Sequence, residues 1–415
     1  LGRWSTIKEV YVESREGGTI IDTAVYDRNM VMKQLYKCDI LGLYLDDADT
    51  LMKNDILAGT NDYDFISNEY RFFSMGTSGE NYLNIWDHDF DFNLSGWNMA
   101  LINETSIVDN NGVKKLYTFD GDFSLIGYKG IWGLTMNLDL YNQNFTEDIF
   151  EIVKNKEWTM DKVTELCSKV KKENGDQTWK PGEDTFGLET SAFDAYGLLT
   201  AAGLKFVTPD ETGKFSTSAD HLKANDAANI ITKIGEYYSQ DYMVVNVGYS
   251  QYQADMESGK TLLIGEVIDI VERMKDVEDL NVTLLPEPLY KAGDDYKSYV
   301  NNKTSLYYIS KNACNGDKNM ISDFWNLYTY HSNKIVLPAF KTAFGSLYCQ
   351  NEKAVDMLDI IMGSRTYDFA YYGADFYGTV SSWVATGENN LGKAATKEAK
   401  TIAQKLTTRL ESVSK

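Results

Sequence analysis

The stretch "NVTLLPEPLYKAGDDYKSYVNNKTSLYYISKNACNGDKNMISDFWNLYTY", residues 281–330, decides the fold class. Its first apolar run, 281–288, reads as a strand that stops at Pro286 and Pro288, because proline does not fit inside a central strand. A second apolar run, 305–310, also reads as a strand. Apolar residues then recur at helical spacing, at Met320, Ile321, Phe324 and Tyr328. The order strand, strand, helix predicts a protein that mixes the two element types.

The same alternation continues on both sides of this stretch. "TLLIGEV" at 261–267 and "YDFISN" at 63–68 indicate strands. A helix is predicted after Thr159, whose hydroxyl can accept an orphan backbone N–H, with Trp158 and Val163 spaced as a hydrophobic staple. Further patterns predict a loop, a helix and a strand over 17–45, strand segments over 115–142, and a helix carrying Ala395, Ala399, Ile402, Leu406 and Leu410. Short strands alternating with helices favour an α/β fold.

Net charge and length exclude several classes of protein. The chain has 415 residues, with 40 Lys and Arg against 61 Asp and Glu, and a formal charge of −21. A chain this long predicts two lobes or domains. Its charge repels nucleic acid and anionic membranes, so we expect neither as a partner. No run of about 18 apolar residues could span a membrane. The opening "LGRWSTIKEV" lacks a signal-peptide pattern, which fits a cytosolic protein or an already processed secreted one.

Motifs for catalysis or metal binding do not occur. The nearest approach to a P-loop, "ADMESGKT" at 254–261, has Ala254 in place of the first glycine and precedes a strand. The acidic loop "ENGDQTWKPGED" at 173–184 fits an EF-hand calcium loop in neither frame. The four cysteines form no C-x-x-C, so we expect free thiols, with one long-range disulfide left open. We therefore expect no metal, no cofactor and no enzyme activity.

Several segments follow, in order, the pattern of one family. "EWTMDKVTELCSKV" at 157–170, "DTFGLETSAFDAYGLLTAAGLKFV" at 184–207, "MESGKTLLIGEV" at 256–267 and the opening stretch resemble the maltose-binding-like (family 1) extracellular solute-binding proteins of ABC importers. The segment 9–36, "EVYVESREGGTIIDTAVYDRNMVMKQLY", is similar to a Gram-positive subgroup. The resemblance spans most of residues 9–380 and rests on the order of its diffuse motifs.

The resemblance implies a two-lobe periplasmic-binding-protein-like fold, whose lobes close on ligand about a hinge. It places crossings near Ile131–Asn137 and Leu285–Leu289. The N-terminal lobe is then expected to comprise 1–130 and 289–335, and the C-terminal lobe 131–288 and 336–415. The family has a first strand before the Y-V-E segment, where only "LGRWSTIK" is found. By analogy we expect an extracellular, cell-surface lipoprotein of a Gram-positive bacterium, although no lipobox cysteine is present.

Ligand residues are expected at strand ends on both sides of the cleft. A content of 28 Tyr, 18 Phe and 8 Trp suits a pocket for a hydroxyl-rich ligand, although core packing explains any single ring as well. The charged candidates also have ordinary structural explanations: Glu69, Asp122 and Glu266 could be solvated surface acids, and Arg365 could form an ion pair. The predicted ligand-binding residues are Asn68, Glu69, Tyr70, Trp97, Asp122, Trp132, Phe193, Asp194, Tyr196, Glu266, Arg365, Tyr367 and Trp383.

Three functions fit these patterns. The first is a monomeric binder that captures a neutral oligosaccharide and delivers it to the permease subunits of an ABC transporter. The second is a secreted carbohydrate-active enzyme, which needs a carboxyl pair at a defined spacing. The third is a surface adhesin or sensor-coupled binder on the same scaffold, and a peptide or another small solute remains open as the ligand.

Overall fold

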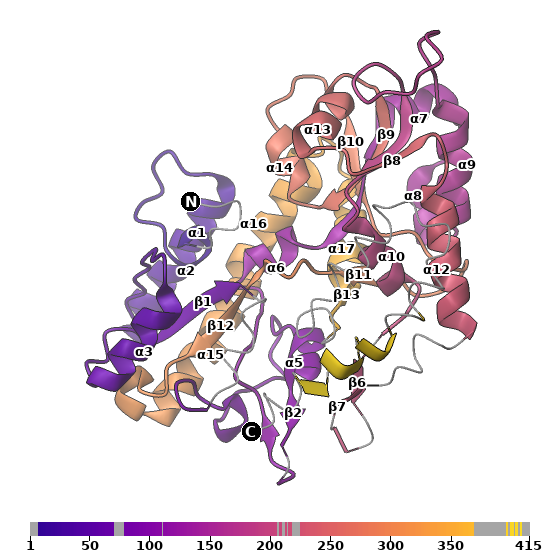
Figure 1. Ribbon diagram of the computed structural model, residues 1–415. Helices are drawn as coiled ribbons and strands as arrows, with labels where there is room; N and C mark the ends of the chain where they lie inside the picture. Colours follow the sequence, from indigo (N-terminus) through magenta and orange to yellow (C-terminus); the bar gives the residue numbers. More distant parts are fainter. Residues whose placement is uncertain are drawn as a thin grey trace.

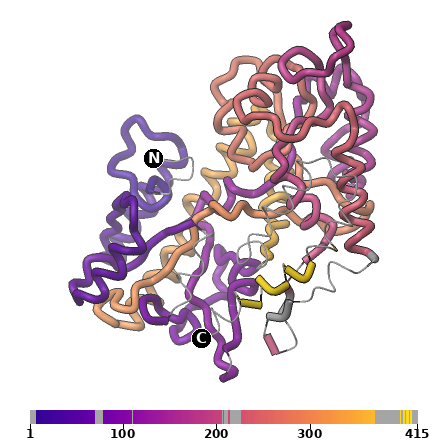
Figure 2. Tube along the Cα trace, in the orientation of Figure 1, coloured from indigo at the N-terminus to yellow at the C-terminus, as the bar shows by residue number. Residues whose placement is uncertain are grey.

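The computed structural model describes residues 7–69, 79–109, 111–205, 207–209, 212–213, 215–217, 225–368, 396, 399–401, 403–405 and 407–408. These residues form two bodies that lie side by side and are joined near the middle of the molecule (Figures 1 and 2). We call the body that contains strands β1 and β12 the N-terminal lobe. The body built on the five-stranded sheet is the C-terminal lobe. Helices and strands alternate along the chain, which confirms the predicted α/β class.

The C-terminal lobe is organised around one mixed sheet. Its strand order is β10-β4-β9-β5-β8, with antiparallel pairing from β10 to β9 and parallel pairing from β9 to β8. All residues of β4, β5, β9 and β10 are buried, as expected for strands covered on both faces. The five strands are β4 (Trp132–Asn137), β5 (Phe186–Thr190), β8 (Met243–Val245), β9 (Thr261–Val267) and β10 (Val282–Leu285).

Helices cover the sheet. Helix α9 packs on β5, α13 on β9, and α17 on β10. The helices of this lobe are α7 (Leu138–Asn144), α8 (Ile149–Lys154), α9 (Met160–Val170), α10 (Asp194–Ala201), α12 (Asn225–Tyr238), α13 (Tyr249–Glu257), α14 (Ile270–Met274) and α17 (Ala354–Gly363).

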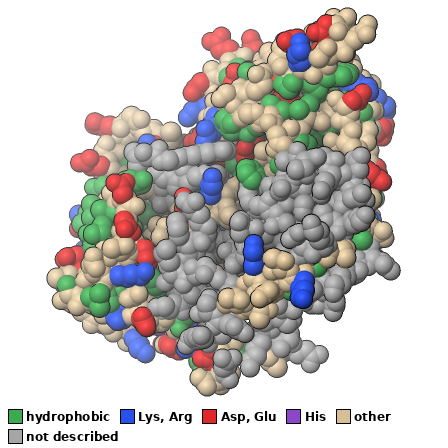
Figure 3. All heavy atoms as spheres, viewed as in Figure 1, with side chains coloured by type: hydrophobic (Ala, Val, Ile, Leu, Met, Phe, Trp, Pro, Cys, Tyr) green, Lys and Arg blue, Asp and Glu red, His purple; other side chains and the backbone are tan. Residues whose placement is uncertain are grey.

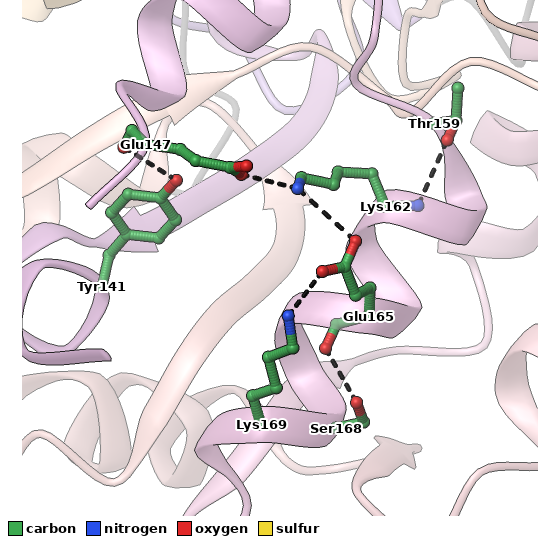
Figure 4. Close-up of polar contacts among 7 residues, drawn as sticks. All are labelled: Tyr141, Glu147, Thr159, Lys162, Glu165, Ser168 and Lys169. Carbon is green, nitrogen blue, oxygen red and sulfur yellow. Dashed lines mark hydrogen bonds and ion pairs between the residues drawn. The ribbon is translucent and has the colours of Figure 1, made fainter. Parts of the chain in front are cut away.

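Helix α9 begins as its sequence predicts. The Thr159 hydroxyl accepts the backbone N–H of Lys162 at 3.1 Å. The Lys162 ammonium lies 2.6 Å from Glu147 and 3.4 Å from Glu165, and Lys169 lies 2.5 Å from the other oxygen of Glu165 (Figure 4). These ion pairs hold the solvent face of the helix, while its apolar face is buried against the sheet.

The N-terminal lobe is centred on a short antiparallel pair of strands. β1 (Phe65–Glu69) pairs with β12 (Ser305–Ile309), although the two strands are far apart in sequence. An aromatic cluster packs beside them, and its rings meet edge to face: the centroids of Phe119 and Trp325 are 4.7 Å apart at 89°. The other elements here are α1 (Ile7–Val10), α2 (Ile20–Tyr36), α3 (Ala48–Ala58), η2 (Ile85–Asp87), α5 (Met99–Thr105), β2 (Ile107–Val108), β3 (Lys114–Lys115) and η3 (Ala313–Gly316).

The lobes are joined by short elements and by one long helical segment. Helix α6 (Leu125–Lys129) leads directly toward β4, and β11 (Ser298–Tyr299) pairs with β13 (Arg365–Thr366). The long segment runs from α15 without a break, and its two wide π turns flank Pro338, whose ring removes a helix donor. The long segment comprises α15 (Lys318–His331), η4 (Ser332–Val336), α16 (Leu337–Lys341) and η5 (Thr342–Leu347). A separate hairpin is formed by β6 (Val207–Pro209) and β7 (Phe215–Thr217).

Two predicted elements are wrong. Residues 38–45 were expected to form a strand but have no regular secondary structure, because in the part of the chain that the structure describes no strand pairs with them. The region 115–142 was predicted as strand segments, yet it contains α6 and α7 as well as β4. The predicted C-terminal helix lies largely outside the described residues.

Candidate ligand-binding site

One group of predicted residues meets at the junction of the lobes. The Asp122 carboxylate accepts hydrogen bonds from the Tyr128 hydroxyl and from the Asn333 amide, the latter at 2.7 Å. The Arg365 guanidinium lies over the Tyr128 ring, 4.3 Å from its centroid. The Tyr367 hydroxyl accepts a hydrogen bond from the Asn98 amide at 2.7 Å. The structure therefore brings Asp122, Arg365 and Tyr367 into one polar network.

The network also contains a buried acid, Asp120, whose charge opposes that of Arg365. Asp120 is 1% exposed and accepts a hydrogen bond from Asn98 at 3.3 Å. Burial raises the pKa of Asp120 to about 6, while the positive charge of Arg365 opposes that rise. Arg365 thus faces two acids, Asp120 and Asp122, and serves first as their counter-ion. In the described structure one terminal nitrogen of its guanidinium has no hydrogen-bond acceptor, so it retains donor capacity.

A second group of predicted residues lies in the C-terminal lobe. Asp194 is fully buried, and its carboxylate accepts the Tyr238 hydroxyl at 2.5 Å. Glu266 accepts the Tyr252 hydroxyl at 2.5 Å. Glu287, which the sequence did not single out, is 1% exposed, and burial, followed by the charge of Asp194, raises the pKa of its carboxyl. Asp194 and Glu266 are thus held by tyrosine hydroxyls of the same lobe.

Phe193 precedes helix α10 and Tyr196 lies in its first turn, and the two side chains differ in exposure. The Phe193 side chain is 42% exposed, whereas Tyr196 is buried. The Tyr196 ring meets that of Tyr299 edge to face at 5.0 Å, and its hydroxyl donates to Asp368 at 3.2 Å. Tyr196 therefore ties α10 to the segment that carries Arg365 and Tyr367. Phe193 is the more exposed of the two.

The remaining predicted residues are spread over both lobes. Asn68 and Glu69 end β1 and are half-buried. Trp97 is buried in the aromatic cluster and donates its ring N–H to the carbonyl of Asp91 at 3.0 Å. Trp132 is 1% exposed, inside the sheet of the other lobe. Tyr70 and Trp383 lie outside the described residues. Trp97 and Trp132 therefore act as core side chains in this structure.

Sequence reasoning missed Asp120, Tyr128 and Glu287. Asp120 shares the local pattern "FDGDF" with Asp122, so the alternation of acids in an apolar run was a usable signal. Tyr128 reads as an ordinary apolar residue of a short segment. Glu287 stands between two prolines, where a solvated turn was the natural interpretation, and only the tertiary structure shows it buried.

A groove within the N-terminal lobe has two of the predicted residues, Asn68 and Glu69, in its lining. It encloses about 1040 Å³ between residues 37–50, strand β1 and helix α15. Leu41 and Leu43 lie at its rim with highly exposed side chains. Figure 3 shows hydrophobic side chains exposed over the N-terminal elements in this view, with acidic groups around them.

Three further properties limit the kinds of site this chain can hold. Within the described residues, no group of three or more His, Cys, Asp or Glu side chains is arranged to hold a metal ion. The cysteines are all free, which answers the open question of a disulfide: Cys38 and Cys314 are half-buried, and Cys167 and Cys349 are buried. No helix in the described part of the chain combines the length and apolar character needed to cross a membrane.

The chain resembles known proteins in its structure and not in its sequence. The sequence matches no family model and none of the curated proteins. A cyclo/maltodextrin-binding protein complexed with maltotetraose has a TM-score of 0.58 and 11% identity, over 94% of this chain and 98% of that protein. The GacH receptor of Streptomyces glaucescens GLA.O, solved unliganded and in complex with acarbose, has a TM-score of 0.57 and 13% identity, over 94% and 96%.

A third solved structure agrees. The Thermus thermophilus maltotriose binding protein, bound with maltotriose, has a TM-score of 0.52 and 10% identity, over 93% of this chain and 97% of its own. All three likenesses cover both lobes of the present chain. The chain therefore has the two-lobed α/β fold of the maltodextrin-binding solute-binding proteins.

Proposed function

We propose that this chain is an extracellular solute-binding protein that captures a neutral oligosaccharide and delivers it to the permease of an ABC transporter. The observation that carries the proposal is the likeness over more than nine-tenths of the chain to several proteins solved with oligosaccharides bound. The charge of −21 is compatible with a neutral sugar and disfavours an anionic solute.

Several of the predicted residues carry groups that such a ligand needs. Phe193 supplies an exposed ring for the apolar face of a sugar, and Arg365 supplies a donor without an acceptor in the described structure. Asn68 and Glu69 would offer polar groups in the groove of the N-terminal lobe. A sugar lacking a matched hydroxyl would leave one of these groups buried and unpaired, at about 1–3 kcal/mol, which is the source of selectivity.

The lobes and their partners are part of the same proposal. We propose 1–130 with 289–335, and 131–288 with 336–415, as the closing units. The pairing of β12 with β1, and the packing of α17 on β10, support this division. The anchor is a lipid on a Gram-positive cell surface, by analogy with the family that the sequence resembles, and the binder works as a monomer.

Turnover of the sugar is not expected. Asp194 and Glu287, two carboxyl groups of the C-terminal lobe, are 0% and 1% exposed. Glycosidases need their two carboxyl groups about 5–5.5 Å or about 6.5–9.5 Å apart, so that a sugar or water fits between them. Because Asp194 and Glu287 are buried, they leave no room for that sugar or water.

Calorimetric titration tests the proposal. Maltotriose, maltotetraose and acarbose are titrated into the purified chain, with an unrelated tripeptide and a polyamine as controls. We expect saturable binding of at least one saccharide, recovered intact after incubation. Binding of the peptide or polyamine alone would contradict the sugar assignment, and release of new reducing ends would show an enzyme.

A further inference from the structure

Helix α5 of the N-terminal lobe is held at both ends by groups from outside that lobe. Asn98 caps the start of α5 by accepting the Leu101 N–H at 3.3 Å, and its amide donates to the Tyr367 hydroxyl at 2.7 Å. At the other end of the helix, the Lys205 ammonium donates to the Glu104 carboxylate at 2.7 Å. Tyr367 follows β13 and Lys205 follows α10, and the proposed division assigns both segments to the C-terminal lobe. Helix α5 therefore joins the two lobes.

The hairpin β6–β7 extends this contact beyond α5. It begins two residues after Lys205. A methyl group added at Gly213, in the turn of the hairpin, would lie 3.1 Å from the side chain of Val108 in β2. Val207 in β6 and Ile107 in β2 are 0% and 3% exposed. Figure 1 shows the hairpin beside α5 and β2, apart from the five-stranded sheet. The ion pair thus lies where a segment of one lobe rests on the other.

The two partners of this ion pair differ in their access to water. The Glu104 side chain is 6% exposed, whereas that of Lys205 is 36% exposed. Burial of a carboxylate is costly, and a cation in contact with it offsets part of that cost. Separation of the lobes would return the Glu104 carboxylate to water and take it away from Lys205. The pair therefore stabilises the arrangement in which the lobes touch, and salt weakens it through the partly exposed ammonium.

We propose that Glu104 and Lys205 form an electrostatic latch between the lobes, which favours the arrangement in which they touch and so strengthens retention of the captured sugar. This inference rests on the proposed function, because only a ligand held between the lobes is retained in this way. Neither residue is among the predicted ligand residues. The latch acts on the equilibrium between touching and separated lobes, and its loss lowers the apparent affinity by the change in that population.

The chain offers a matched control for the latch. The Lys171 ammonium lies 3.0 Å from the Asp241 carboxylate, and the Lys171 side chain is 34% exposed. Lys171 follows α9 and Asp241 precedes β8, so this ion pair lies wholly within the C-terminal lobe. Lys171→Met removes one positive charge of similar exposure, as Lys205→Met does, without touching the contact between the lobes.

Small-angle X-ray scattering of the full chain without ligand tests the latch. It is measured at about 0.01 M and about 1 M salt, where the Debye lengths are about 30 Å and about 3 Å. The wild-type radius of gyration should rise with salt. Lys205→Met should show the larger radius at both salt concentrations, because its latch is already absent. Lys205→Arg, which keeps the cation, and Lys171→Met should both behave as wild type.

Sugar affinity provides the second readout, by calorimetry with maltotetraose or with another saccharide that binds more tightly. At low salt, Lys205→Met should weaken binding at least about fivefold, the lower end of the usual coupling between two states. Glu104→Gln removes the charge from the other side of the pair and should cause the same loss. It tests the latch independently should Lys205→Met fail to fold. Lys171→Met should bind as tightly as wild type.

The outcomes separate the latch from the function on which it rests. A radius of gyration in Lys205→Met that equals that of wild type at low salt would overturn the latch. So would an equal increase in Lys171→Met, since that result would show a general effect of removing a cation. Failure of the wild-type chain to bind any saccharide would overturn the proposed function, while scattering without ligand still decides whether the ion pair holds the lobes together.

Discussion

Exposure separates the aromatic residues that can meet a ligand from those that hold the core. Trp97 and Trp132 have the ring chemistry expected of a sugar platform, but both are buried and packed among other side chains. Phe193 has a less polar ring and no hydrogen-bonding handle, yet it is 42% exposed at the start of α10. Ring stacking on a sugar needs an open face, so position matters more here than residue type.

Phe193→Ala tests this distinction. We expect the variant to lose about 1–2 kcal/mol of sugar-binding free energy, a five- to thirtyfold rise in Kd, because a stacking surface is removed. Its urea midpoint should stay near that of wild type, since the ring is not part of the core. Calorimetry and urea unfolding provide the two readouts.

Trp97→Ala is the opposite case and serves as the control. Deleting a buried tryptophan ring should cost about 3–5 kcal/mol of unfolding free energy, through lost contacts and a cavity. Should Phe193→Ala destabilise the fold while leaving affinity intact, Phe193 would belong to the core and the ligand site would have to be sought elsewhere.

Helix α9 and strand β5 show how closely neighbouring elements approach one another. Gly187 in β5 faces Cys167 of α9, and a methyl group at Gly187 would lie 2.2 Å from the Cys167 Cβ and 2.6 Å from its Cα. The second of these atoms is backbone, so the helix itself would have to move. The absence of a side chain at Gly187 sets the distance at which α9 covers the sheet.

Gly187→Ala is therefore expected to be strongly destabilising. Overpacking against backbone should lower the unfolding free energy by about 1–3 kcal/mol or more. This loss is expected even though alanine is at least as favourable as glycine in a strand. Gly363→Ala is the matched control, because nothing lies within 4 Å of the added methyl at the end of α17. Equal urea midpoints for the two variants would refute the tight packing of α9 on β5.

Local signals explain which elements the sequence predicts well. Helix α9 is defined by its own cap and apolar stripe, so Thr159 and Val163 suffice to predict it. Residues 38–45 carry a strand-like composition, but a strand needs a partner, and pairing is a non-local property. The meeting of Asp194 with Glu287, and of Asp122 with Arg365, depends on the same non-local arrangement. Phe193 was predicted as a ligand residue from the family-like stretch "TSAFDAYG", at the end of a strand.

Buried acids also act on the stability of the whole molecule. Glu9 joins α1 to α6 and β12, because it accepts the Ile126 N–H at 2.8 Å and the Tyr307 hydroxyl at 3.0 Å. Burial raises the pKa of Glu9 to about 8 and that of Glu189 to about 9. Both groups titrate near pH 4.5 in the unfolded chain, so the folded state holds their protons more tightly.

The sign of the resulting pH dependence follows. Stability from these protons is fully present below about pH 4.5 and is lost as pH rises through about 8 to 9. We therefore expect the unfolding free energy to fall between pH 5 and pH 9. Glu189→Gln should flatten that slope by up to about 1.4 kcal/mol per pH unit. Urea unfolding at pH 5, 7 and 9 measures it.

Asp176→Asn provides the control for the pH series. Asp176 lies in an exposed loop, and the Thr178 backbone N–H lowers the pKa of its carboxyl below 3.8. Its titration is complete well below pH 5, so its removal should not change the slope. A slope that Glu189→Gln leaves untouched would mean that Glu189 is ionised in the folded protein.

At the scale of the whole molecule, the proposed capture of a neutral oligosaccharide depends on closure of the two lobes around it. Small-angle X-ray scattering during titration with maltotetraose, or with whichever saccharide binds, tests that closure most directly. We predict a saturable fall in the radius of gyration that reaches its plateau at one saccharide per chain. Scattering that stays unchanged while calorimetry shows the saccharide bound would contradict closure, and with it the proposal that the lobes capture the sugar between them.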